Sequence, residues 1–212
     1  MNKMKFNIKK TKNNILKQKK LYLFLIGLMV TGLIAGILFW FVISKEDKLL
    51  VTKNLTDFFS CIKEGDSINY GASLLNSVVT SLIYVVLIWL LGISIIGLPI
   101  ILVMMATKSF IVGFSIVGII SSYGLKGIVG AFVYVFPHQI VFLLLLILLG
   151  FYASAFCIKL FKYLFLKQMI NFKEAMRKYL KILGISCLSV LVISLFETFI
   201  STYFIKLFTL LI

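Results

Sequence analysis

The sequence predicts an all-α polytopic membrane protein with five transmembrane helices. Hydrophobic residues make up 61% of the 212-residue chain, against roughly 45–50% in a typical soluble domain. Charged residues make up only 14%, and most of them fall in short segments that separate long uncharged runs. A globule of this length has too little interior to bury so much apolar surface. Runs of about 20 apolar residues instead match a hydrocarbon layer about 30 Å thick.

The basic residues predict the orientation of these helices. Residues 1–20 contain eight lysines and no acid, and residues 159–181 contain six lysines, one arginine and one acid. By contrast, residues 45–66 carry four lysines and five acids. Because lysine and arginine stay on the cytoplasmic side during insertion, we expect both basic segments inside and residues 45–66 outside. An odd number of crossings must then lie within residues 67–158.

Five crossings satisfy this requirement, with a cytoplasmic N-terminus and an outside C-terminus. Residues 1–20 form a basic cytoplasmic tail, and residues 21–212 form a single transmembrane bundle. The first apolar stretch is too long for the h-region of a cleaved signal peptide, so it is expected to be a retained helix. Residues 67–158 are too long for one crossing and fit three. The expected transmembrane helices cover about 21–43, 74–97, 99–123, 128–158 and 182–205.

Two prolines mark the expected breaks in these helices. Proline lacks a backbone N–H and disfavours helix at the preceding residue, but it suits the first turn of a new helix. Gly97 and Pro99 therefore predict a tight inner turn, which places Lys108 roughly 13 Å into the membrane. The alternative is a re-entrant segment at 98–107 that leaves Lys108 at the cytoplasmic surface. Pro137 is expected to kink the fourth crossing, where neighbouring helices can satisfy the freed carbonyl.

Residues 44–65 predict an amphipathic helix outside the membrane. Its apolar residues recur at helical spacing, Ser44 and Asp47 have the spacing of an N-terminal cap, and Gly65 suits the C-terminal end. Such a helix can float on the outer leaflet, or it can present a docking surface to an extracytoplasmic partner, and the two roles are compatible. The candidate docking residues are Val51, Leu55, Phe58, Phe59 and Ile62.

Residues 159–181 form a basic, aromatic-rich cytoplasmic connector. Asn171 and Glu174 fit a capping box that starts a helix at Phe172, which continues into the fifth crossing. The basic residues are interpreted as a topology signal that also attracts anionic membrane lipid. Because both basic segments flank membrane helices, nucleic acid is not an expected partner.

Residues that carry catalysis or bind metals are scarce. His138 is the only histidine, and Cys61, Cys157 and Cys187 lie far apart with no CxxC motif, so no metal site is expected. The sequence has no P-loop, GxSxG or dinucleotide-binding pattern, and it lacks the residues of an intramembrane metalloprotease or aspartyl protease. We therefore expect a chain that is not an enzyme and needs no cofactor. Cys61 is expected to be a free thiol on the outside.

Three polar residues are expected at membrane depth: Lys108, His138 and Glu197. A charge in hydrocarbon costs at least about 2.5–3.5 kcal/mol, so each needs a polar partner or water. Glu197 is interpreted as a buried carboxylate that fixes helix packing, and a proton or substrate path or a wet outer vestibule are the alternatives. Lys108 is the one intramembrane cation that could pair with Glu197. His138 is interpreted as a hydrogen-bonded residue beside the kink at Pro137.

Small residues indicate where helix backbones approach closely. Gly32 and Gly36 have the GxxxG spacing that permits such contacts. Because this spacing is frequent in membrane helices, it is only a weak indication of a homo-oligomer, which stays a possible state of the chain.

Several segments resemble the stage II sporulation protein M family. The stretch Trp89–Leu102, which reads WLLGISIIGLPIIL, is similar to the family signature. The resemblance covers nearly the whole chain, although Ser109 stands where glycine is usual and Thr202 replaces a proline. The other matching segments are Lys45-Glu46-Asp47, Phe58-Phe59 and Glu64-Gly65 in the outer helix, Lys108 followed by Gly113-Phe114, and Phe196-Glu197 in the last helix.

The resemblance implies a membrane scaffold in the mother-cell membrane at the sporulation septum. It implies recruitment of stage II sporulation protein P, a peptidoglycan amidase and endopeptidase, which brings stage II sporulation protein D, a lytic transglycosylase. Together they would thin septal peptidoglycan and drive engulfment of the forespore. A transporter or permease-type subunit that uses Lys108 and Glu197 is the competing hypothesis, because the break at Gly97–Pro99 resembles transporter design. The absence of an evident internal repeat weighs against it.

Overall fold

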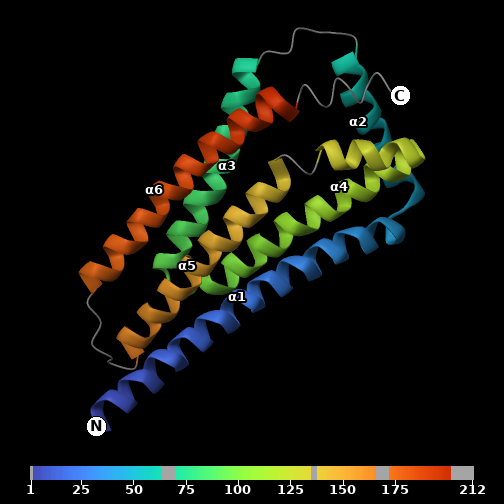
Figure 1. The fold of residues 1–212 in the computed structure, drawn as a ribbon. Helices are drawn as coiled ribbons and strands as arrows, with labels where there is room; N and C mark the ends of the chain where they lie inside the picture. Colours follow the sequence, from blue (N-terminus) through green and yellow to red (C-terminus); the bar gives the residue numbers. More distant parts are fainter. Residues whose placement is uncertain (1, 64–69, 135–137, 166–171, 202–212) are drawn as a thin grey trace.

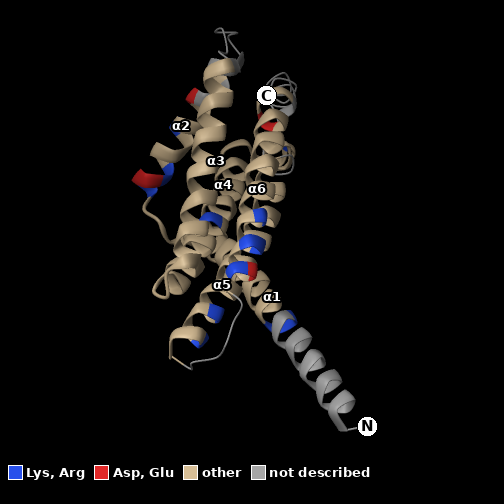
Figure 2. Ribbon diagram, turned by 90° about the vertical axis from the view of Figure 1, so that its left-hand side faces the viewer, with Lys and Arg blue, Asp and Glu red and all other residues tan. Residues whose placement is uncertain are grey.

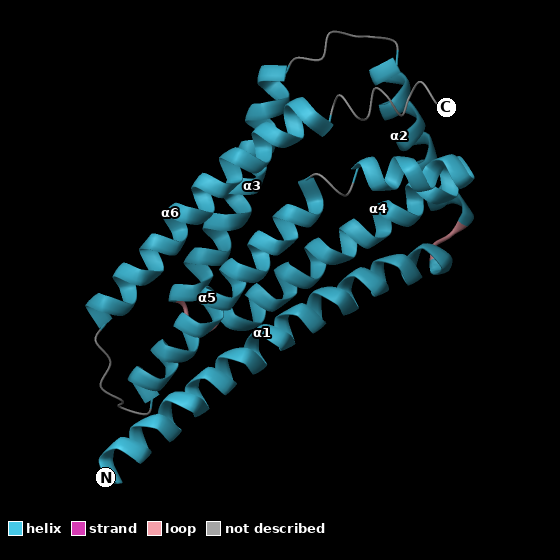
Figure 3. Ribbon diagram, viewed as in Figure 1, coloured by secondary structure: helices cyan, strands magenta, loops and turns pink. Residues whose placement is uncertain are grey.

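A computed structural model describes residues 2–63, 70–134, 138–165 and 172–201 (Figure 1). Nearly all of these residues are helical, and none of them forms a strand (Figure 3). The elements are α1 (Asn2–Val42), α2 (Lys45–Lys63), α3 (Tyr70–Ile93), α4 (Gly97–Tyr134), α5 (Ile140–Phe165), α6 (Phe172–Phe196) and the π-helical turn η2 (Glu197–Ser201).

Five helices are long and apolar enough to cross a membrane, which confirms the predicted fold class. They cover Lys19–Val42, Gly71–Ile93, Gly97–Val133, Ile140–Phe165 and Phe172–Phe199. Within the most apolar 18-residue stretch of each helix, half of the residues are buried in α5 but only 17% in α1. α5 is therefore the central helix of the bundle, and α1 lies at its edge. The chain is a multi-pass membrane protein.

The third and fourth spans have different boundaries from those expected. α4 runs for 38 residues, past the expected end at residue 123, and α5 begins only at Ile140. Gly124 has φ 59° and ψ −134°, a conformation that glycine adopts without the steric cost of a side chain. Residues 128–134, expected in the fourth span, thus belong to the end of α4 beyond this break. Pro137 lies outside the described residues.

The turn between α3 and α4 is tight, as the pattern around Pro99 predicts. The N–H groups of Ser94 and Gly97 each donate to a carbonyl three residues earlier, at 3.0 and 3.1 Å. The thiol of Cys157, on α5, lies 3.3 Å from the carbonyl oxygen of Ser94 and covers the turn. Because α4 is helical from Gly97 onward, the re-entrant alternative for residues 98–107 is excluded.

The spans alternate in direction, so the ends of the bundle differ in charge. The basic residues at the end of α5 and the start of α6 lie at the end of the bundle where α1 begins (Figure 2). α2, which carries Glu46 and Asp47 in its first turn, lies at the opposite end with the last turns of α6 (Figure 1). The two basic segments thus share one end of the bundle, as the predicted topology requires.

Close backbone contact joins α1 to α4 through the GxxxG pair. A methyl group added at Gly32 would lie 2.7 Å from the carbonyl oxygen of Ala106, and one at Gly36 would overlap the backbone of Phe110. From the opposite side, a methyl group at Gly113 would overlap the backbone of Leu33. Gly32 and Gly36 therefore serve a contact within the chain, and their spacing does not indicate a homo-oligomer.

We predict that topology reporters will distinguish the two ends of the bundle. Fusions after residues 10 and 170 should read cytoplasmic, and fusions at residue 55 and at the C-terminus should read outside, because the basic segments stay inside during insertion. Paired alkaline phosphatase and fluorescent protein fusions measure this directly. A cytoplasmic C-terminus would contradict the five-crossing topology.

Candidate functional site

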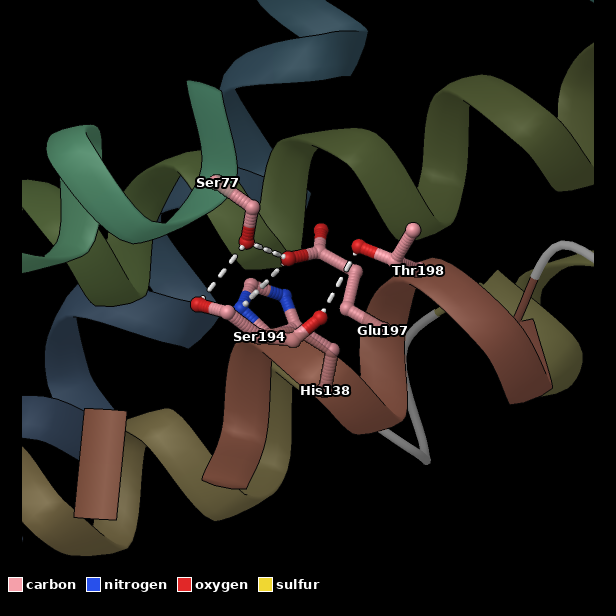
Figure 4. A network of polar contacts seen from close by, with 5 residues as sticks. All are labelled: Ser77, His138, Ser194, Glu197 and Thr198. Carbon is pink, nitrogen blue, oxygen red and sulfur yellow. Dashed lines mark hydrogen bonds and ion pairs between the residues drawn. The ribbon is translucent and has the colours of Figure 1, made fainter. Parts of the chain in front are cut away.

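Lys108, His138 and Glu197 come together inside the bundle although they lie on different helices. Glu197 Oε2 lies 3.1 Å from His138 Nε2 (Figure 4). The ammonium group of Lys108 lies over the Phe142 ring on which the His138 imidazole stacks, and the charge of Glu197 acts on it from beyond ion-pair distance. The three polar residues that were expected at membrane depth thus form one cluster. It contains a basic and an acidic side chain, which carry charges of opposite sign, and an imidazole.

Serine and threonine hydroxyls complete the surroundings of Glu197. Ser77, on α3, donates a hydrogen bond to Glu197 Oε2 and also lies 3.1 Å from Ser194 Oγ. One turn further along, Thr198 donates to the Ser194 carbonyl at 2.9 Å (Figure 4). Ser194 and Thr198 are both almost fully buried. This network ties the end of α6 to α3.

Aromatic rings hold the Lys108 ammonium group. Its Nζ lies 5.8 Å from the ring centre of Tyr84 and 5.4 Å from that of Phe142. The imidazole of His138 stacks on the same Phe142 ring, with 6.0 Å between the ring centres. A cation over an aromatic face gains about 2 kcal/mol or more where water is excluded. Phe142, which is only 2% exposed, therefore positions both Lys108 and His138.

Both Glu197 and His138 lie where the regular α-helix gives way to a π-helical turn. Glu197 is the first residue of η2, and His138 and Gln139 lie in a π-helical turn directly before α5. A π-turn adds a residue to the helical repeat and thereby redirects the side chains that follow, which is why such turns are frequent at functional sites. The side chain of Glu197 is 33% exposed and that of His138 only 9%.

The cluster resembles a hydrolase triad in composition but not in arrangement. A catalytic serine needs a hydrogen bond to a histidine that takes its proton. Here Ser77 donates to the Glu197 carboxylate instead, and neither ring nitrogen of His138 makes a well-aligned hydrogen bond. Within the described part of the chain, no group of three His, Cys, Asp or Glu residues could hold a metal ion. The arrangement can fix helices or exchange protons, but it does not activate a nucleophile.

Sequence reasoning missed Ser77, Tyr84 and Ser194. Ser194 lies three residues before Glu197, so its position on the same helical face was a usable signal. Ser77 and Tyr84 lie on α3, and only the packing of α3 against α5 and α6 brings them to the cluster. One serine or tyrosine among many in an apolar run carries no such information.

The outer helix α2 begins as predicted and packs partly on its own chain. Ser44 Oγ accepts the N–H of Asp47 at 3.1 Å, which caps the helix. Val51 and Leu55 are half-buried, and Leu55 packs beside Gly118 of α4. Of the candidate docking residues, Leu55 is therefore partly covered by α4. The side chains of the other three, Phe58, Phe59 and Ile62, and that of Cys61 lie outside the described part of the structure.

The signature stretch Trp89–Leu102 contributes a buried aromatic stack at the inner end. Trp89 Nε1 donates to the Tyr179 carbonyl at 3.4 Å, and the Tyr179 hydroxyl donates to the Trp89 carbonyl at 2.8 Å. The Tyr179 ring stacks between Trp89 and Phe156, with ring centres 5.4 and 4.4 Å apart. Gly92 makes room, because any side chain there would overlap the Tyr179 hydroxyl. The stretch therefore fastens α3 to α6.

Comparison with known proteins identifies the family. The family model described as stage II sporulation protein M matches residues 21–202, which include the polar cluster and all five spans except the first two residues of the first one. No curated protein and no solved structure matches the chain at a significant level. The matched range covers most of the 212 residues. The chain belongs to the stage II sporulation protein M family, whose members are membrane proteins of sporulation.

Proposed function

We propose that the protein is a non-catalytic membrane scaffold that recruits and anchors peptidoglycan hydrolases at the sporulation septum. The hydrolases would be stage II sporulation protein P and, through it, stage II sporulation protein D, which thin the septal wall during engulfment. The scaffold would lie in the mother-cell membrane. The observation that carries the proposal is α2, a short helix outside the five spans that displays charged residues and exposed leucines in a protein of this family.

The surface of α2 supports a role in binding a partner. Glu46, Lys53 and Asp57 are exposed along the helix, and the neighbouring Leu49 and Leu50 are 73% and 59% exposed. α4 packs against the side of α2 that carries Thr52 and Leu55. One face of this helix is fixed to its own protein and the rest is open, so it can hold a partner at a defined place. Because the helix is already held in position, binding does not have to offset the entropy cost of ordering it.

The polar cluster supports the same proposal through its lack of hydrolytic geometry. Ser77 is bonded to a carboxylate, and His138 is not placed to take its proton. Cleavage of peptidoglycan would therefore be the work of the recruited proteins. The scaffold would hold these proteins at the septum.

We predict that Phe58→Asp combined with Phe59→Asp abolishes recruitment of stage II sporulation protein P. Two charges placed among apolar anchor residues would leave unpaired charges in the interface and cost several kcal/mol of binding energy, on the order of the largest interface effects. The variant should still insert, because α2 lies outside the spans. Fluorescence microscopy of labelled stage II sporulation protein P at the septum measures the loss.

A matched control adds the same charge to the exposed face of α2. Asn54→Asp combined with Thr56→Asp also introduces two carboxylates, at exposed positions, but it removes no apolar anchor residue and should therefore reduce recruitment far less. Immunoblots must show equal protein levels for both double variants. Normal septal recruitment by the Phe58 and Phe59 variant would mean that the apolar stripe of α2 is not the docking surface.

A transporter or permease-type subunit is a second candidate function, because one observation favours it. Lys108, His138 and Glu197 form a cluster of ionisable groups within the membrane, and such residues often mark proton or substrate paths. Glu197 is partly exposed, so a proton could reach it. Substitutions at Lys108 and Glu197, described in the Discussion, separate this function from the scaffold.

A further inference from the structure

A cleft lies between the inner ends of α5 and α6. It is a shallow, open cleft lined by Phe156, Lys159, Leu160, Tyr163, Phe172 and Ala175. Phe156 is 5% exposed and forms its buried wall, whereas Tyr163 and Phe172 are 46% and 45% exposed and stand at its edges. The cleft thus combines an apolar interior with an open side on the surface of two membrane-spanning helices.

The surroundings of the cleft carry a strong positive charge. Lys159 lines it directly, Lys162 follows one turn later in α5, and Lys173 and Arg177 are exposed at the start of α6. The acid among these described residues, Glu174, is engaged by Lys178 at 2.7 Å. The cleft therefore attracts an anion and offers an apolar surface to hydrocarbon.

We propose that this cleft binds an anionic phospholipid from the membrane leaflet at this end of the bundle. One acyl chain lies along the open side of the cleft, beside the exposed rings of Tyr163 and Phe172, and the phosphate group lies near Lys159. Basic pockets between membrane helices recognise such headgroups, and the apolar wall selects a lipid over a free phosphate ion. The inference does not depend on the recruiting role of α2, since it concerns the opposite end of the molecule.

Native mass spectrometry of the full-length protein tests the proposal. The protein is exchanged into detergent with equal amounts of phosphatidylglycerol and phosphatidylcholine of identical acyl chains, and the retained lipids are counted. The wild-type protein should retain one molecule of phosphatidylglycerol and little phosphatidylcholine. Lys159→Gln should reduce this preference at least three-fold, whereas Lys181→Gln, which removes the same charge from an exposed position outside the cleft, should not.

A second variant tests the interior of the cleft without changing its charge. Ala175→Phe should fill the space and abolish retention of either lipid, with a melting temperature close to that of wild type. Equal loss of preference in the Lys159 and Lys181 variants would overturn the proposal in favour of unspecific attraction to the basic segment. Full retention of phosphatidylglycerol by Ala175→Phe would also overturn it. The Lys159 and Lys181 comparison stands even where Ala175→Phe fails to fold.

Discussion

Gly36→Leu is expected to remove most of the protein from the membrane. A side chain at this position would enter the backbone of α4 at Phe110 and Phe114, and backbone cannot move aside as a flexible side chain can. Overpacking commonly costs about 1–3 kcal/mol, and a change of about 1–2 kcal/mol already alters protein abundance several-fold in cells. Because α1 packs chiefly on α4, the first span should detach. Immunoblots of membrane fractions measure the loss.

Two other glycines provide matched controls for this variant. A methyl group added at Gly27, on α1, or at Gly184, on α6, would meet no atom within 4 Å. Gly27→Leu and Gly184→Leu should therefore leave the protein level near that of wild type, although both add the same bulk to a membrane helix. Levels of Gly36→Leu equal to those of the controls would show that α1 and α4 are not held by this close contact.

The number of spans and the inner turn could be predicted because they rest on local patterns. Uncharged runs between charged segments determine where a chain can cross the membrane, and proline restricts the backbone around itself. The expected end of the third span at residue 123 coincides with the break at Gly124, which has a positive φ. The helical turns that follow this break as far as Tyr134, and the late start of α5 at Ile140, were not predicted. They depend on how the chain packs after the break, which no local pattern in an apolar run determines.

The polar cluster was predicted in its members but not in its arrangement. The cost of burying charge indicated that Lys108, His138 and Glu197 each needed a partner, and Lys108 was the cation expected to pair with Glu197. The 3.1 Å approach of His138 to Glu197 depends on how the start of α5 packs beside the end of α6. Ser77 and Phe142, which position the charged groups, belong to apolar runs whose packing no local pattern determines.

Glu197→Leu should lower the protein level more than Glu197→Gln. Glutamine keeps the shape of the side chain and can still accept the hydrogen bond from Ser77, whereas leucine loses it, at a cost of roughly 0.5–2 kcal/mol of bundle stability. Glutamine also removes the charge that opposes Lys108, so Glu197→Gln should be somewhat less stable than wild type. Quantitative immunoblots and thermal unfolding in detergent compare the variants.

Combining Lys108→Met with Glu197→Gln should restore the stability, and hence the protein level, that each single substitution lowers. Removing one partner leaves the charge of the other without a counter-charge, whereas removing both leaves neither charge. The loss of stability in the double variant should therefore be about 1 kcal/mol smaller than the sum of the two single losses. In the scaffold, this neutral double variant should reach wild-type levels and support engulfment, because helix packing is all that the pair provides. A proton path would not survive the change, since neither methionine nor an amide exchanges protons. Wild-type levels and normal partner recruitment together with blocked engulfment would therefore reject the scaffold interpretation of this cluster and favour the transporter.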